Sequence, residues 1–319
     1  MATLLTSLLG RWAVSDERRA SIAAVSGALC LGSSAILVRL ADSSASVTSL
    51  ARCALALPIL GALSMLERKR GLPVPSRRSQ WMARFAGAFL AGDLILWAHS
   101  ISAIGAGLAT VIPNLQVPIV ALVAWGLLGE RPPRALFFVV PMMLTGIAFV
   151  VGFANAAAGT GRTAAGVAFG AATAVCYAIF ILLLRQATGL GVHGVPTSIA
   201  RPLYEASLGG AVTSLLLMIA LHDFAIGPLW PSVGWLALLA VSSQAIGWLL
   251  ITAAMPRLPV ASVSTLLLVQ PVSALALSIA FLGERPAAAQ IAGAGLILLG
   301  VFVAARFPAR RDEPTESAE

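Results

Sequence analysis

The sequence predicts an all-α integral membrane protein in which ten transmembrane helices form two inverted repeats of five. Three observations support this prediction: a very apolar composition, apolar stretches of membrane-crossing length, and an internal repeat. Of the 319 residues, 59% are hydrophobic and 11% are charged, and the mean hydropathy is +0.92. A soluble domain needs a polar exterior that this composition does not supply. The composition therefore excludes a soluble enzyme and a nucleic-acid-binding protein with a large polar face.

The apolar stretches are about 20 residues long and recur from about residue 20 to about residue 305. A helix of that length crosses a hydrocarbon core of ~30 Å, whereas a transmembrane β-strand has ~10 residues of alternating polarity. Glycine and proline mark several breaks, such as Gly129 with Pro132 and Gly283 with Pro286. The expected spans are 20–41, 47–66, 80–102, 105–127, 134–153, 164–186, 197–221, 232–253, 259–281 and 287–305.

The second half of the chain repeats the first. Residues 48–52 (TSLAR) match residues 197–201 (TSIAR), and residues 128–132 (LGERP) match residues 282–286 (LGERP). Matches at Arg and Glu, in the same order, are not expected from an apolar composition alone. Because each half has five spans, an odd number, the second half must enter the membrane from the opposite side. Inverted repeats of this kind recur in secondary transporters.

The distribution of basic residues predicts the orientation. Loops on the side of the N-terminus carry most of the basic residues, whereas loops on the other side carry Arg162 and Arg285. The positive-inside rule therefore places both termini in the cytoplasm of a multi-pass protein of the cell's inner (plasma) membrane. The same distribution explains the net charge of +8 without a nucleic-acid partner. The basic residues on the N-terminal side are Arg11, Arg18, Arg19, Arg68, Lys69, Arg70, Arg77, Arg78, Arg131, Arg134, Arg257, Arg306, Arg310 and Arg311.

Four regions follow from these boundaries. Residues 1–19 are expected to form a cytoplasmic N-terminal segment, and residues 306–319 a polar cytoplasmic tail. Between them lie the two five-helix repeats, 20–153 and 164–305. The three cysteines fall inside spans and the three histidines are scattered, so no disulfide framework, metal site or cofactor is expected.

Charged residues within the spans need a reason, because each costs at least ~2.5–3.5 kcal/mol on insertion scales. Asp93 lies in the middle of the third span and shares a helix face with Trp97. It is a candidate proton site or substrate-amine ligand, and a structural helix–helix hydrogen bond is the alternative. Arg201 and Glu205 are spaced to form an ion pair, and Glu205 is a second candidate for proton coupling. Arg201 and its repeat mate Arg52 are candidate gate or framework residues that bond backbone carbonyls.

Amide and aromatic side chains recur near mid-depth, where inverted-repeat transporters bind their substrate. Asn114 and Gln116 lie between two prolines of the fourth span, and Gln270 is the counterpart of Gln116 in the ninth. Gln244 and Trp248 share one face of the eighth span. For each residue, core packing or satisfaction of a backbone carbonyl is the alternative. The candidate cavity-lining residues are Asp93, Trp97, Asn114, Gln116, Tyr204, Gln244, Trp248 and Gln270.

Each LGERP turn places an acid, Glu130 or Glu284, between a helix-ending glycine and a proline that starts the next helix. A negative charge stabilises the positive N-terminus of a helix. We therefore expect each carboxylate to complement the helix that follows it.

Ten spans in two inverted repeats, with an LGERP turn closing the fourth and ninth spans, resemble the EamA group of the drug/metabolite transporter (DMT) superfamily. The second half matches best, at residues 270–271 (QP), at 282–284 (LGE) and at Gly300. The first half departs from the family pattern at Leu31, where the family commonly carries Trp, and at Pro118, which lies one position late. The resemblance implies a secondary-active transporter, more often an exporter, of small organic metabolites such as amino acids or related compounds. It also implies alternating access, driven by protons or by exchange.

Three alternatives stay open. A sugar-nucleotide or metabolite exchanger needs several inward-facing basic residues for phosphate, and the central spans hold few. A channel needs a continuous polar stripe or charged ring, and an intramembrane enzyme needs a metal cluster or an activated nucleophile. The partners expected are a small-molecule substrate and the lipid bilayer. The substrate, the coupling ion, the direction of transport and the choice between monomer and homodimer are left open by the sequence.

Overall fold

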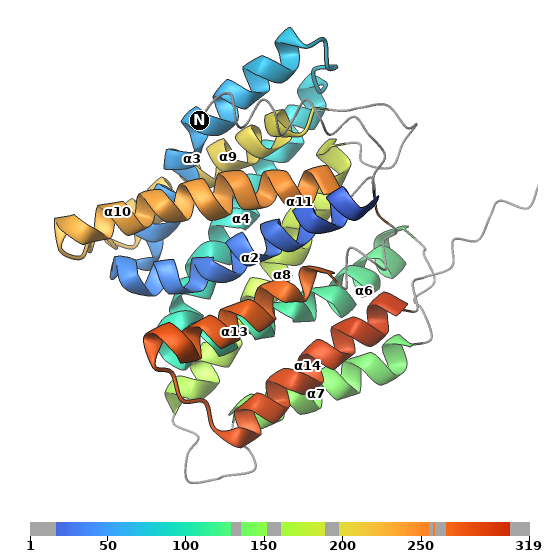
Figure 1. Ribbon diagram of the computed structural model, residues 1–319, viewed down its shortest axis with the longest axis vertical. Helices are drawn as coiled ribbons and strands as arrows, with labels where there is room; N and C mark the ends of the chain where they lie inside the picture. The colour runs from blue at the N-terminus through green and yellow to red at the C-terminus, as the bar shows by residue number, and fades with distance from the viewer. Residues whose placement is uncertain are drawn as a thin grey trace, which may run out of the picture.

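The computed structural model describes residues 17–128, 135–151, 161–188, 198–254, 258 and 266–306 (Figure 1). Within these residues every regular element is a helix, as the sequence predicts. Most of the expected N-terminal segment and C-terminal tail, together with Glu130, lies outside the described residues. The helices are α2 (Glu17–Ala41), α3 (Ala45–Lys69), α4 (Arg77–Ile104), α5 (Ala106–Val111), η1 (Ile112–Leu115), α6 (Gln116–Leu128), α7 (Leu136–Val151), α8 (Gly161–Thr188), α9 (Ala200–Ala220), α10 (Leu229–Leu239), η2 (Ala240–Gly247), α11 (Trp248–Ala254), α13 (Val269–Leu282) and α14 (Ala288–Arg306).

The helices have the length and composition of membrane spans. Of the described helices, seven are long and apolar enough to cross a membrane, with α10, η2 and α11 forming one of them. Three shorter apolar helices, Ala106–Val120, Leu136–Val150 and Val269–Leu282, lie where the fourth, fifth and ninth spans are expected. The first part of the expected ninth span, residues 259–265, lies outside the described residues. The structure is therefore that of a multi-pass membrane protein.

Local sequence explains where several helices begin and end. The Ser44 hydroxyl accepts from the Val47 N–H at the start of α3. The Ser76 hydroxyl accepts from the Ser79 N–H at the start of α4. Such caps satisfy N–H groups that have no partner within the helix. Gly105 ends α4 with a φ of +89°, and Gly283 ends α13 with a φ of +64°. Glycine tolerates this left-handed backbone better than any other residue.

Two spans have an irregular middle. The fourth span is interrupted by the 3₁₀ turn η1, which contains Pro113. The eighth span contains the π-helical stretch η2, which carries Gln244. A mid-helix 3₁₀ turn often marks a hinge, and π-helical turns occur frequently at functional sites. Both irregular segments therefore mark places to look for function.

Two pairs of repeat mates pack directly against each other and run antiparallel. The pairs are α3 with α9 and α7 with α14, and Figure 1 shows α7 and α14 together at one edge of the bundle. The fourth and ninth spans also meet, through the non-equivalent segments α5 and α13. Along α7 and α14 the contacts run in opposite order, because Met143 lies against Gly300 and Gly146 lies against Gly293. Antiparallel mates are the geometry that an inverted repeat requires. The two halves interlock, since α4 of the first half packs mainly on α8 and α9 of the second.

Two glycines of α14 provide a matched test of this packing. A Cβ added at Gly293 would lie 2.4 Å from the Gly146 carbonyl oxygen, whereas a Cβ at Gly295 would meet nothing within 4 Å. We expect Gly293→Ala to lower the melting temperature in detergent, because overpacking costs about 1–3 kcal/mol. We expect Gly295→Ala to leave it unchanged or slightly higher, since alanine favours a helix. Thermal melts followed by size-exclusion chromatography would measure both, and equal melting temperatures would contradict the α7–α14 contact.

Candidate functional site

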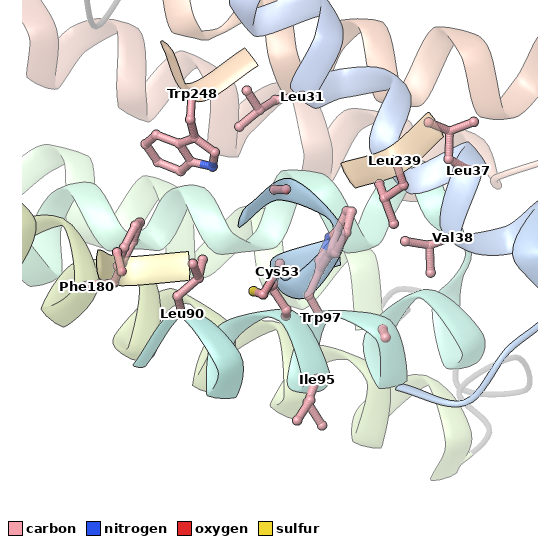
Figure 2. Packing of buried hydrophobic residues seen from close by; sticks show 14 of the residues in the cluster. Leu31, Leu37, Val38, Cys53, Leu90, Ile95, Trp97, Phe180, Leu239 and Trp248 are labelled. Atoms are coloured by element: carbon pink, nitrogen blue, oxygen red, sulfur yellow. The ribbon is translucent and has the colours of Figure 1, made fainter. Parts of the chain in front are cut away.

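Polar and aromatic side chains from both halves of the chain meet inside the bundle. Figure 2 shows two of them, Trp97 and Trp248, among the packed apolar side chains of the largest core cluster. The five side chains of this group that lie on α3, α4, η2 and α11 are each at most 9% exposed. We call this group the central cluster, and its members are Arg52, Asp93, Trp97, Gln116, Tyr177, Gln244 and Trp248.

Arg52 links three helices in the central cluster. Its Nε donates to Oε1 of Gln244 at 3.1 Å, and Nε2 of Gln244 donates to the Ser207 hydroxyl on α9 at 3.1 Å. The guanidinium carbon also lies 5.9 Å from the centroid of the Trp97 ring. The Nε hydrogen bond thus goes to a side-chain amide rather than to the backbone carbonyl expected from the sequence. The expected framework role of Arg52 stays a prediction, now with a specific partner.

Asp93 is the acid of the central cluster. It is 9% exposed and interacts electrostatically with Arg52. The charge of Asp93 also interacts electrostatically with Tyr177 and Cys176 on α8. A buried charge is tolerated when an opposite charge lies nearby. The carboxyl group is therefore positioned to bind a substrate amine or to exchange a proton, the two functions expected from the sequence.

Tyr177 belongs to the central cluster but was not expected from the sequence. Its ring centroid lies 6.2 Å from that of Trp248 and 6.3 Å from that of Phe180. Its hydroxyl lies near the Gln116 side chain. Tyr177 sits in an apolar stretch of the sixth span, where nothing in the local sequence marks it. The one available signal was its rarity, because the chain has only two tyrosines.

Two polar atoms of the central cluster have no hydrogen-bond partner among the described residues. They are the indole Nε1 of Trp248 and Oε1 of Gln116, and both atoms are buried. Leaving a buried donor or acceptor unpaired costs about 1–3 kcal/mol. Buried polar atoms of this kind are ready to contact a ligand or water. Both residues lie near Tyr177.

Three other candidate residues have contacts elsewhere. The Asn114 side chain donates to two backbone carbonyls of its own turn, at 2.8 and 3.2 Å. The Tyr204 ring lies 5.5 Å from the Arg201 guanidinium and packs against the largest core cluster. Gln270 lies where α13 packs against α2, since a Cβ added at Gly32 of α2 would lie 2.7 Å from the backbone carbonyl oxygen of Gln270. The cavity-lining role of these three residues stays a prediction without support from the contacts of the central cluster.

Glu205 lies in a three-residue ion network between α4 and α9. Its side chain is 0% exposed, and its two carboxylate oxygens lie 2.5 Å from Nε of Arg84 and 2.5 Å from Nη2 of Arg201. Arg201 also donates to the side-chain oxygen of Gln80 at 3.1 Å. The expected pair of Arg201 with Glu205 is confirmed. Arg84, the second cation, was missed because it comes from a different helix.

Two further carboxylates cap helices of the opposite half. Glu67, at the end of α3, accepts from the Ser198 hydroxyl at 2.6 Å and from the Ala200 N–H at 3.1 Å, at the start of α9. Asp223, which follows α9, accepts from the Ser46 N–H at 3.0 Å, at the start of α3. Burial opposes the charged form of Asp223, but hydrogen bonds from Ser46 and Ser44 lower the pKa of this carboxyl group below its usual value. The two caps therefore fasten α3 and α9 together at both ends.

Glu284 corrects an expectation from the sequence. Its carboxylate accepts from the N–H groups of Ala106 at 2.7 Å and Gly107 at 3.2 Å, at the start of α5. It therefore caps a helix of the first half rather than α14, the helix that follows it. The N–H of Ala287, just before α14, instead donates to the Gln290 side chain at 3.0 Å. The local sequence suggests the nearest helix, but the folded chain brings another N-terminus closer.

Two cavities open at opposite ends of the bundle. One, of about 240 Å³, lies at the Glu67 end and is lined by residues that include Arg68, Ser198 and Arg201. The other, of about 220 Å³, lies at the Asp223 end and is lined by residues that include Asp42 and His99. No member of the central cluster lines either cavity, as far as the described residues show. On α3, Arg52 lies between Ala45, which lines the second cavity, and Ser64, which lines the first, so the central cluster lies between the two cavities.

Comparison with known proteins agrees with this architecture. A solved structure whose title reads only "Crystal structure of protein" matches 91% of this chain and 98% of its own length, with 20% identity and a TM-score of 0.59. That likeness supports the fold alone. No curated protein matches the chain significantly. The profile of the EamA-like transporter family matches residues 18–152 and 164–306, which are most of the chain and include both repeats. The protein is therefore a member of the EamA-like transporter family, within the DMT superfamily.

Proposed function

We propose that the protein is a secondary-active transporter that moves a small organic metabolite outward by alternating access, with the central cluster as its substrate site. Amino acids or related compounds are the substrates to test first. One observation carries the proposal: charged, amide and aromatic side chains from both repeats converge inside the bundle, between cavities at its two ends. Such a site can be exposed to each side in turn when the halves rock.

The proposal gives roles to the residues of the central cluster. Asp93 binds a proton or the amine of the substrate, and Arg52, fixed by Gln244, balances its charge. Trp248 offers an indole N–H and Gln116 an amide oxygen, neither of which has a partner among the described residues, to polar groups of the substrate. The rings of Trp97, Tyr177 and Trp248 would contact its apolar part. Glu205 stays a second candidate for proton coupling, although two arginines neutralise it in this conformation.

Transport by purified protein in proteoliposomes tests the proposal. Radiolabelled amino acids and UDP-sugars would be screened with a pH gradient, without one, and with unlabelled compound inside. Accumulation that needs the gradient supports proton coupling, and uptake that needs internal compound supports exchange. Uptake of UDP-sugars alone would favour the sugar-nucleotide exchanger. A steady ionic conductance without saturable uptake would support a channel and contradict the proposal.

Trp248→Phe isolates the role of the indole N–H. Phenylalanine keeps an aromatic ring that can pack on Tyr177 and Phe180, but the five-membered ring of the indole is lost together with the unpaired donor. We expect KM to rise about tenfold with little change in maximal rate, since a hydrogen bond to substrate contributes about 1 kcal/mol or somewhat more. Trp230→Phe makes the same change at a side chain that is 79% exposed and should leave KM unchanged. Equal KM values for both variants would show that the N–H does not contact substrate.

A further inference from the structure

The outer half of the fourth span is a separate segment with a joint at each end. It consists of α5, which is six residues long. At its start Gly105 has a φ of +89°, and at its end the 3₁₀ turn η1 contains Pro113. Proline has no backbone N–H and weakens the helix at that point. The segment can therefore tilt as a unit without breaking the helix on either side.

Glu284 fastens this segment to α13. Its two carboxylate oxygens take the N–H groups of Ala106 and Gly107, which are the first free donors of α5. A carboxylate in this position also interacts favourably with the positive end of the helix. A Cβ added at Gly107 of α5 would lie 2.5 Å from the Ser278 hydroxyl of α13, so α5 and α13 are in close contact next to Glu284. One carboxylate thus closes the outer end of the pair α5–α13.

The pair α3–α9 differs, because it is fastened along its whole length. Glu67 caps α9 at one end and Asp223 caps α3 at the other. Between these caps the hydroxyl groups of Ser49 and Ser214 form a hydrogen bond of 2.8 Å. These contacts hold α3 and α9 together at both ends and in the middle. No 3₁₀ or π-helical turn interrupts either of these two described helices.

We propose that residues 106–111 form an outer gate, that Glu284 is its latch, and that η1 is its hinge. Opening breaks the two Glu284 hydrogen bonds and tilts the segment about residues 112–115. The hinge is followed directly by Gln116, whose side chain lies near the Tyr177 hydroxyl, so the movement reaches the central cluster at Gln116. The α3–α9 pair remains closed at both ends during opening. This inference goes beyond the proposed function by assigning a gate, and it can be tested without a known substrate.

Labelling of the native Cys176 tests the latch. Cys176 is half-buried, lies next to Tyr177, and has its sulfur 3.3 Å from a Cβ position at Gly92, the neighbour of Asp93. In a background carrying Cys30→Ala and Cys53→Ala, it is the only remaining thiol. A membrane-impermeant maleimide would be added to right-side-out vesicles, and separately to inverted vesicles. We expect Glu284→Gln to raise the rate of labelling several-fold from the side of Glu284, with no change from the other side.

Asp223→Asn is the matched control. It removes the same charge from another carboxylate that caps a helix at the same end of the bundle, but from the pair assigned as fixed. We expect its labelling rate to equal that of the parent. Equal rates for Glu284→Gln and the parent would overturn the latch, and equal acceleration by both variants would replace it with a general loosening. Should Glu284→Gln not fold, Glu284→Asp keeps the charge with a shorter reach and should give the same direction of change. Labelling does not depend on transport, so failure of the latch and failure of the proposed function are distinguishable.

Discussion

Glu205→Gln should strongly reduce the stability of the protein, with a large fall in melting temperature and in the yield of monodisperse material. Glu205 is 0% exposed and lies 2.5 Å from both Arg84 and Arg201. Glutamine fills the same space but leaves two guanidinium groups without a counter-charge. Removing one partner of a buried ion pair costs about 3–5 kcal/mol, and hydration of the two arginines, whose side chains are each 33% exposed, brings the cost to the lower end of that range. This is still a large fraction of a typical folding free energy. Thermal melts in one detergent, at one pH, would measure the loss.

A triple variant separates the loss of charge balance from the loss of a carboxylate. Replacing Glu205 with leucine and both Arg84 and Arg201 with methionine removes all three charges at once. We expect this variant to melt well above Glu205→Gln, because apolar residues of similar volume can replace a buried ion network. A Glu205→Gln protein as stable as the parent would contradict the structural role. Loss of pH-dependent transport in such a stable variant would instead support Glu205 as a proton site.

The features that follow from the chain's own periodicity could be predicted from the sequence. Hydropathy places the apolar helices, because a span needs about 20 apolar residues wherever it lies. The repeat of TSLAR and LGERP, with five spans in each half, predicts antiparallel mates, and the contacts of Gly146 with Gly293 show them. The pair of Arg201 with Glu205 was also predictable, since residues at i and i+4 are neighbours on one helix.

Contacts between helices could not be predicted, because they depend on how each helix is rotated and which helix it meets. Arg84 reaches Glu205 across 121 positions of sequence, and Glu284 reaches Ala106 across 178. Nothing in the neighbouring sequence distinguishes Arg84 from the other arginines of the chain, or Ala106 from the other alanines. Tyr177 shows the same limit for the central cluster: its importance comes from Trp248 and Gln116, which lie on other helices. Local sequence predicts the helices, whereas tertiary packing decides which side chains meet.

Asp93→Asn should abolish transport driven by a pH gradient and lower the melting temperature, because it leaves the buried Arg52 without its nearby opposite charge. The hydrogen bond from Arg52 to Gln244, at 3.1 Å, remains and limits this loss of stability, so transport can be measured on the folded fraction. Asparagine has nearly the same shape as aspartate but cannot bind and release a proton, so a cycle that carries a proton on this residue stops. Asp42→Asn makes the same change at an exposed position and should transport like the parent.

The remaining activity of Asp93→Asn distinguishes its two proposed roles. A proton site predicts that exchange against internal compound continues while gradient-driven uptake is lost, because substrate binding does not require the carboxylate. A ligand for the substrate amine predicts that both activities fall together and that KM for exchange rises by at least tenfold, since a charge-assisted hydrogen bond contributes about 1.5–3 kcal/mol. Uptake and pH dependence equal to those of the Asp42→Asn control would remove Asp93 from the mechanism. Arg52 would then be the charged residue of the central cluster to test next for binding of the substrate.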